Sequence, residues 1–262
     1  MSDGALAPVW RELRARHRTA LIPFLTAGHP TPAASLDALR RAAEHADVLE
    51  VGVPFSDPLA DGPVIQRAAF AALGQGMTLA RTLALVAEAR LARPVVLFSY
   101  LNPVRRYGVE RLLRDAAQAG VAALLLTDLP AGADPALEGA VAGSPLDLIR
   151  LVAPTSSEAR MREALAGARG FAYVVARLGV TGQSAGLAAD LGETVARVRR
   201  VSELPVAVGF GISTADQARQ VARLADGVVV GSALVDRLER EGPAGAATFL
   251  RGLRAALDEG TA

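Results

Sequence analysis

The sequence alternates eight times between a short apolar segment and a segment with helical periodicity, and this alternation restricts the fold most. The expected strands are apolar on both faces and are bounded by Gly, Pro, Asp or Ser. Strands of this kind, separated by helices, are typical of a parallel sheet that is covered on both faces. We expect them to be centred on residues 21–25, 48–53, 95–100, 122–127, 148–152, 171–176, 206–209 and 227–230.

Eight such units in 262 residues favour an α/β fold with a single, closed (β/α)8 TIM barrel. The alternative is a doubly wound open sheet, which usually has fewer strands and a Gly-x-Gly-x-x-Gly turn after its first strand. No such turn follows the first strand here. Extra helices are expected before the first strand, over residues 7–18, and after the second. We expect one domain over residues 1–262, with an N-terminal helix (1–19), a barrel (20–258) and a tail (259–262).

Two residue types are absent, and each absence excludes a class of chemistry. The chain has no cysteine, which excludes disulfides, thiolate catalysis and cysteine-bound metals. It has no lysine, so a Schiff base cannot form on a side-chain amine. His17, His29 and His45 lack the paired spacing of metal ligands. We therefore expect no metal, and acid–base chemistry if a carbon–carbon bond is cleaved.

The charge pattern argues against a nucleic-acid partner. The formal net charge is +1, and the arginines are spread along the helical segments rather than clustered. No run of 18 apolar residues is present, and the N-terminus lacks the features of a signal peptide. We expect a cytoplasmic chain that does not bind a membrane.

The segment from Leu49 to Pro63 carries a candidate pair of acid–base groups. Glu50 interrupts an otherwise apolar strand, where an unpaired carboxylate would cost several kcal/mol. Asp61 follows on a proline-rich loop that could close over the strand end, a plausible layout for paired carboxylates. A lone glutamate in a strand is, however, more often an edge residue that faces water. An aspartate before Gly-Pro is usually a turn residue.

The expected strands seven and eight are each followed by a glycine-containing turn that opens a helix, at residues 209–213 and 231–232. Helix N-termini with small residues bind phosphate, and barrels often place that site after strands seven and eight. A glycine-rich segment after strand six, which contains Gly182, is predicted to be a lid. These features favour a phosphorylated substrate, whereas the alternative is that the glycines only permit tight turns.

The chain resembles the tryptophan synthase α-chain family from about Leu21 to Val235. Five runs carry the resemblance, in the order and spacing of the family: LIPFLTAGHP, LEVGVPFSDPLADGPVIQ, GVTG, PVAVGFGIS and VVVGSALV. The PFSDPLADGP run is specific to the family, whereas the glycine turns occur in many phosphate-binding barrels.

The resemblance implies a retro-aldol cleavage of indole-3-glycerol phosphate to indole and glyceraldehyde 3-phosphate. It implies that Glu50 is the acid–base group that delivers a proton to C3 of indole. Asp61 would accept a hydrogen bond from the indole N–H, and Tyr173 would line the catalytic site. Thr181, in the lid, would contact Asp61 when the lid closes.

The resemblance also implies binding sites and a partner. The phosphate would be held by Gly182, Gly211, Gly231 and Ser232. The indole would be surrounded by Phe24, Tyr100, Leu125, Thr127 and Phe210. A pyridoxal-phosphate β chain would receive indole in an α2β2 assembly, at an interface with Pro54, Asp57, Asn102 and Pro130, and this chain would bind no cofactor. Leu178 departs from the family, which commonly has a small hydroxyl residue there.

Two alternatives to the α subunit stay open. A free-standing indole-glycerol-phosphate lyase would use the same residues. A non-catalytic allosteric activator of a β chain would not need them, and the presence of Glu50, Asp61 and Thr181 argues against it.

Overall fold

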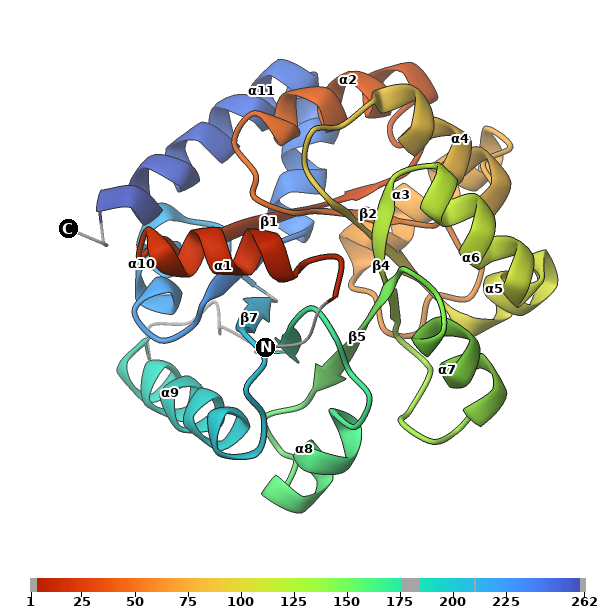
Figure 1. Cartoon of the computed structure of the whole chain (residues 1–262). Helices are drawn as coiled ribbons and strands as arrows, with labels where there is room; N and C mark the ends of the chain where they lie inside the picture. Colours follow the sequence, from red (N-terminus) through yellow and green to blue (C-terminus); the bar gives the residue numbers. More distant parts are fainter. Residues whose placement is uncertain (1–3, 176–183, 210, 260–262) are drawn as a thin grey trace.

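The computed structural model describes residues 4–175, 184–209 and 211–259, with the backbone alone over residues 184–189. It confirms the predicted barrel: the strands are all parallel, pair in chain order, and close where β8 pairs with β1 (Figure 1). The strands are β1 (Ala20–Thr26), β2 (Leu49–Gly52), β3 (Val95–Ser99), β4 (Val121–Leu126), β5 (Asp147–Val152), β6 (Ala172–Val175), β7 (Val206–Gly209) and β8 (Gly227–Val230).

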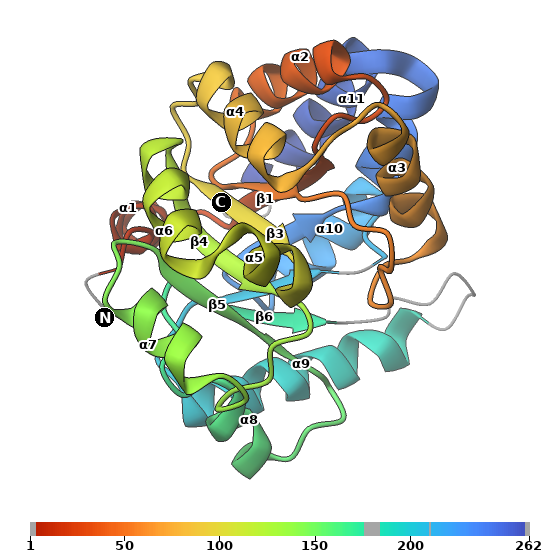
Figure 2. The same cartoon turned by 90° about the vertical axis from the view of Figure 1, so that its right-hand side faces the viewer.

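Helices surround the barrel (Figures 1 and 2). Their bounds are α1 (Ala7–Ala15), α2 (Pro32–Ala43), α3 (Pro63–Gly74), α4 (Leu79–Ala89), α5 (Leu101–Tyr107), α6 (Val109–Gln118), α7 (Pro135–Ala142), α8 (Glu158–Ala164), α9 (Ser184–Val201), α10 (Ala215–Ala222) and α11 (Ser232–Glu259). The extra helix predicted before β1 is α1, which ends three residues earlier than expected, and the one predicted after β2 is present, since both α3 and α4 lie between β2 and β3. The final helix, α11, contains a non-helical residue, Gly242, directly before Pro243.

Both faces of the strands are buried, which explains why the strand segments are apolar throughout. One cluster of buried side chains fills the inside of the barrel and includes Ile22, Phe24, Val96, Phe98 and Leu125. A larger cluster lies between the strands and the surrounding helices. Alternate residues of each strand contribute to the two clusters, because successive side chains of a strand point to opposite faces. Burial of this apolar surface is the main favourable term in folding.

Side chains at the N-terminal ends set the start of several helices. At five described helices, a hydroxyl or carboxylate oxygen of the N-cap residue accepts a hydrogen bond from a backbone N–H of the first turn. These N-cap residues are Thr31, Thr78, Asp134, Ser157 and Thr214. Such caps replace hydrogen bonds that the first turn of a helix cannot make internally.

No helix was predicted directly after β3, but the structure has α5 there. It begins at Leu101, directly after the strand, and Pro103 lies in its first turn, where a missing N–H does no harm. Its cap comes from another loop: the Leu101 N–H donates to Asp128 Oδ1 over 2.7 Å. This tertiary cap explains why local sequence signals missed the helix.

No single helix in the described ranges is long and apolar enough to cross a membrane. One pair, α3 with α4, passes the same test of length and composition when taken together, but it is bent by 95°.

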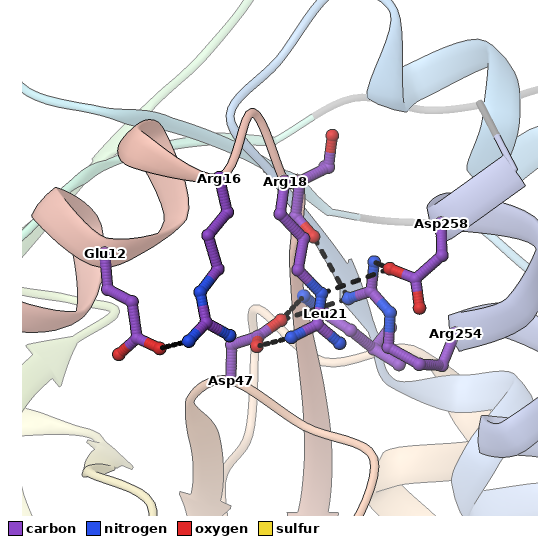
Figure 3. Close-up of polar contacts among 8 residues, drawn as sticks. Glu12, Arg16, Arg18, Leu21, Asp47, Arg254 and Asp258 are labelled. Carbon is purple, nitrogen blue, oxygen red and sulfur yellow. Dashed lines mark hydrogen bonds and ion pairs between the residues drawn. The ribbon is translucent and has the colours of Figure 1, made fainter. Parts of the chain in front are cut away.

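A buried carboxylate, Asp47, joins four parts of the chain at the end of the barrel where the strands begin (Figure 3). It precedes β2, is 3% exposed, and accepts a hydrogen bond from the Leu21 N–H over 2.9 Å. Arg254 of α11 donates to the same oxygen over 3.0 Å, and Arg18 lies 3.3 Å from the other oxygen. Removing one partner of a buried ion pair is destabilising, because the charge of the other partner is then less compensated.

We predict that Asp47→Ala lowers the free energy of unfolding by about 3 kcal/mol, because the buried Arg254 loses one of its two carboxylate partners in the described chain and keeps only Asp258 (2.6 Å). Urea unfolding followed by circular dichroism measures this change. The control is Glu12→Ala, which removes an exposed ion pair to Arg16 (3.1 Å). Such a pair contributes less than about 1 kcal/mol. Equal effects of the two substitutions would contradict the prediction.

Candidate active site

A cavity of about 460 Å³ opens at the end of the barrel where the strands finish. Residues of β1, β2, β3, β6 and β8 form its floor, and α3, α11 and the segment after β7 form its walls. It is lined by Phe24, Glu50, Asp61, Val64, Ile65, Phe98, Tyr173, Gly211, Ile212, Ser213, Val229, Gly231, Ser232, Ala233, Asp236, Arg237, Arg240 and Phe249. In parallel α/β barrels, this end carries the reactive groups.

Glu50 lies on the inner face of β2, level with Phe24 on β1 and Val96 on β3. It is 1% exposed, so it is not an edge residue that faces water. Neither carboxyl oxygen has a hydrogen-bond partner among the described residues. Burial without a partner disfavours the ionised form and raises the pKa of Glu50 to about 8. The group therefore holds a proton at neutral pH and can act as an acid.

Asp61 lies on the loop between β2 and α3 and also lines the cavity. Its Oδ2 atom accepts a hydrogen bond from the Tyr100 hydroxyl over 3.0 Å. Burial raises the pKa of Asp61 to about 6, and the hydrogen bond from Tyr100 limits this rise. At neutral pH, Asp61 is therefore mainly a carboxylate. The cavity thus combines a protonated and an ionised carboxyl group, a pattern that assigns acid and charge-stabilising roles.

Tyr173 lines the cavity from β6, and burial is the main reason that its pKa lies well above the usual value. The charges of Glu50 and Asp61 raise this pKa further. The strand pairing leaves room for the ring only because residue 209, on the neighbouring β7, is glycine. A Cβ atom there would overlap the Tyr173 hydroxyl, and a Cβ at Gly52 would overlap the Phe24 ring. These two glycines leave room for the rings of Tyr173 and Phe24, a role that was not predicted from the sequence.

The two predicted phosphate turns differ in the structure. Gly231 and Ser232 line the cavity at the start of α11, where the first N–H groups of a helix have no internal partner. Gly211 also lines the cavity, but the N–H groups of Ser213 and Thr214 are occupied, because both donate to the Gln217 carboxamide oxygen. The turn after β8 therefore offers amides to an anion, whereas at the turn after β7 the amides of Ser213 and Thr214 are already bonded.

The other predicted pocket residues lie at different depths. Phe24 lines the cavity and packs edge-to-face on Phe98, with ring centroids 5.2 Å apart. Leu125 is buried deeper inside the barrel, in the same apolar cluster. Thr127 is half-buried at the end of β4. Four predicted positions lie outside the described residues: Leu178, Thr181, Gly182 and Phe210.

The four predicted partner contacts lie on loops at this end of the barrel, except Asn102, which is in the first turn of α5. Asp57, Asn102 and Pro130 are exposed, whereas Pro54 is buried within the chain. Pro54 therefore offers little surface to a partner in this conformation.

Several cavity residues were not anticipated from the sequence. Asp236 and Arg240 follow Ser232 at intervals of four residues, which places all three on one face of α11. This spacing was a signal that could have found them. Phe249, in contrast, reaches the cavity from beyond the break at Gly242. In the part of the chain that the structure describes, no three His, Asp or Glu side chains gather closely enough to hold a metal ion.

Comparisons with known proteins agree with one another. A family model described as tryptophan synthase alpha chain matches residues 10–256. A tryptophan synthase alpha chain of Synechococcus elongatus is 46% identical over 260 residues, which cover 97% of each chain. A chain of Mycobacterium tuberculosis tryptophan synthase is similar in structure, with a TM-score of 0.90 at 41% identity, over 98% of this chain and 99% of that one. The alpha subunit from Legionella pneumophila gives a TM-score of 0.89 at 32% identity, over 98% and 100%.

We predict that Glu50 makes stability fall as the pH rises. Its folded pKa, about 8, exceeds the unfolded value of 4.5, so between these values the folded state binds more protons than the unfolded state. The free energy of unfolding should then fall by up to about 1.4 kcal/mol per pH unit from this group. Glu50→Gln removes the effect, so the variant should gain stability relative to the parent chain as the pH rises from 5 to 8.

Urea unfolding at several pH values measures this dependence. The control is Glu44→Gln, which changes an exposed glutamate at the end of α2. The stability of this variant should change with pH as steeply as that of the parent chain. Parallel stability curves for the parent chain and Glu50→Gln would contradict a raised pKa.

Proposed function

The chain belongs to the tryptophan synthase α-chain family, and we propose that Glu50 and Asp61 carry out the reaction of that family in it. The reaction is the cleavage of indole-3-glycerol phosphate to indole and glyceraldehyde 3-phosphate, which makes the enzyme a carbon–carbon lyase. The observation that carries the proposal is the shared cavity, which holds a buried, unpartnered Glu50 and an ionised Asp61.

In the first step, protonated Glu50 delivers its proton to C3 of the indole ring. This breaks the aromaticity of the five-membered ring and places positive charge near the ring nitrogen. Asp61, as a carboxylate, accepts the N–H hydrogen bond and stabilises that charge. A fixed carboxylate at this position should lower the barrier by a few kcal/mol, because it is oriented before the charge develops.

In the second step, the bond between C3 and the glycerol side chain breaks. A base removes the proton of the hydroxyl on the adjacent carbon, which becomes the aldehyde of glyceraldehyde 3-phosphate. The electrons of the broken bond return to the ring and restore the aromatic indole. Glu50 is a carboxylate after the first step, and we assign the base role to it. Tyr173 and Phe24 line the cavity beside it and exclude water.

The phosphate of the substrate would bind at the start of α11. Gly231 and Ser232 line the cavity there, and a helix N-terminus presents N–H groups and a partial positive charge to an anion. Gly211, after the neighbouring strand β7, lines the same cavity and would add to the phosphate site. Thr181 and Gly182 keep their predicted roles in lid closure and phosphate binding, although they lie outside the described residues. Leu125, Thr127 and Phe210 keep theirs around the indole.

The family also implies a β-chain partner. We propose an α2β2 heterotetramer in which the β chain carries pyridoxal phosphate and receives the indole, while this chain binds no cofactor and no metal. Exposed Asp57, Asn102 and Pro130 surround the cavity end and support an interface there. Residues 1–262 would act as one domain, in the cytoplasm.

We predict that Glu50→Gln lowers turnover of indole-3-glycerol phosphate at least about a hundredfold, because the amide cannot supply the proton. Asp61→Asn should lower it by a similar factor, because a preorganised negative charge is lost. Since Asp61 must be ionised and Glu50 protonated, kcat/KM should follow a bell between limbs near pH 6 and pH 8. Glu44→Gln serves as the control. Full turnover by Glu50→Gln would overturn its acid–base role.

We predict that a β chain accelerates the release of indole. The assay measures indole from indole-3-glycerol phosphate with the purified chain alone, and again after a β chain is added. Slow release that accelerates on addition supports an α subunit under allosteric control. Fast release that no β chain changes would indicate a free-standing lyase. If the chain were a non-catalytic activator, indole would be released only in the mixture, and the mixture with Glu50→Gln would release it equally fast.

A further inference from the structure

Tyr100 makes three contacts with one segment, the loop of residues 55–61 between β2 and α3. Its hydroxyl lies 3.0 Å from Asp61 Oδ2 and 3.0 Å from the Ala60 nitrogen. Its ring packs on Phe55, with centroids 5.1 Å apart. The side chain is 4% exposed, so these contacts are shielded from water. A single residue after β3 therefore holds the loop that carries Asp61.

The direction of these hydrogen bonds follows from the groups involved. A backbone N–H can only donate, so Ala60 uses a lone pair of the Tyr100 oxygen. An ionised carboxylate can only accept, so the single proton of the Tyr100 hydroxyl points to Asp61 Oδ2. Thus the hydroxyl is fixed between Ala60 and Asp61, and no described residue donates a hydrogen bond to Asp61 Oδ1, which leaves that oxygen to a ligand.

Tyr100 contacts the Asp61 side chain in addition to its predicted place near the indole. It is absent from the residues that line the cavity, whereas its hydrogen-bond acceptor Asp61 is among them. Tyr100 therefore reaches the residues that line the cavity through Asp61, whose Oδ2 atom it contacts.

We propose that Tyr100 is a positioning residue, which fixes the Asp61 carboxylate so that Oδ1 receives the N–H of the indole ring. The inference rests on the proposed function, because it assumes that Asp61 stabilises the charge on the ring. It adds the support of a catalytic group to the predicted ligand contact of Tyr100. A displacement of a catalytic group by about 1 Å can lower a rate a hundredfold, so such support matters.

The same hydrogen bond keeps Asp61 ionised. Donation from Tyr100 lowers the pKa of Asp61, against the effect of burial. The other charged or titratable groups that face the cavity come from β2, β6 and α11, and they are Glu50, Tyr173, Asp236, Arg237 and Arg240. The two arginines are engaged with carboxylates on their own helix, Arg237 with Glu241 (2.7 Å) and Arg240 with Asp236 (3.5 Å). No guanidinium group in the described ranges pairs with Asp61.

The test is Tyr100→Phe, which removes the hydroxyl and keeps the ring. We expect the midpoint of Asp61 titration, measured by ¹³C NMR of the carboxyl carbon, to rise by about one pH unit, since a hydrogen bond to a charged group is lost. The acid limb of the kcat/KM profile should move upward by the same amount. At pH 7, kcat should fall at least about tenfold, with a smaller change in KM, because Asp61 stabilises a positive charge that the ring carries only after it is protonated.

The matched control is Tyr107→Phe. Tyr107 of α5 also donates to an aspartate, Asp115, over 2.7 Å, but its pair lies between α5 and α6 and does not line the cavity. This variant should leave both the Asp61 midpoint and the pH profile unchanged.

A second replacement avoids the loss of the hydroxyl. Tyr100 exchanged for 3-fluorotyrosine has a more acidic phenol, which donates a stronger hydrogen bond, so the Asp61 midpoint should fall. The proposal is overturned if Tyr100→Phe folds and leaves the midpoint and the acid limb in place, or, should that variant not fold, if fluorination leaves the midpoint unchanged. Failure of the proposed function would look different. In that case Asp61→Asn would retain full turnover, while Tyr100→Phe would still raise the midpoint of the Asp61 titration measured by NMR.

Discussion

The Glu50 carboxyl group lies inside a closed barrel without a hydrogen-bond partner in the described part of the chain, and the chemistry of the site depends on this constraint. An ionised carboxylate there would cost several kcal/mol, so the group keeps its proton at neutral pH. The surroundings cannot relax around it, because the strand register holds it between Phe24 and Val96. The fold therefore maintains an acid at a defined place, at the expense of stability above the ordinary pKa of glutamate.

The two ends of the barrel give their carboxylates different partners. At the end where the strands begin, Asp47, Asp147 and Asp226 each accept a hydrogen bond from a backbone N–H and each pair with an arginine. At the other end, neither Glu50 nor Asp61 has such a pair among the described residues. The first arrangement offsets each negative charge with an arginine, so the loss of either partner should destabilise the folded chain. The second leaves carboxyl groups whose pKa is raised by burial, as a reactive site needs.

Glu50 and Asp61 also differ from each other, although both line the same cavity. Glu50 is on a rigid strand and has no donor beside it, whereas Asp61 is on a loop and receives the Tyr100 hydroxyl. The lower burial of Asp61 and the hydrogen bond from Tyr100 together make Asp61 a carboxylate at neutral pH, whereas Glu50 is an acid. The distinction depends on the packing of Tyr100 against the loop of residues 55–61, because this packing holds the Asp61 carboxylate in place.

The sequence by itself determined the barrel, because the alternation of apolar strands and amphipathic helices is a local pattern that only one closed parallel architecture satisfies over eight repeats. It also singled out Glu50, since a carboxylate in an apolar strand conflicts with packing. Only the tertiary structure decided which groups meet between distant segments: Asp128 caps α5, Tyr100 holds Asp61, and Gly209 leaves room for Tyr173. These contacts join residues 27 to 39 positions apart, and local periodicity carries no information about side chains that separate strands bring together.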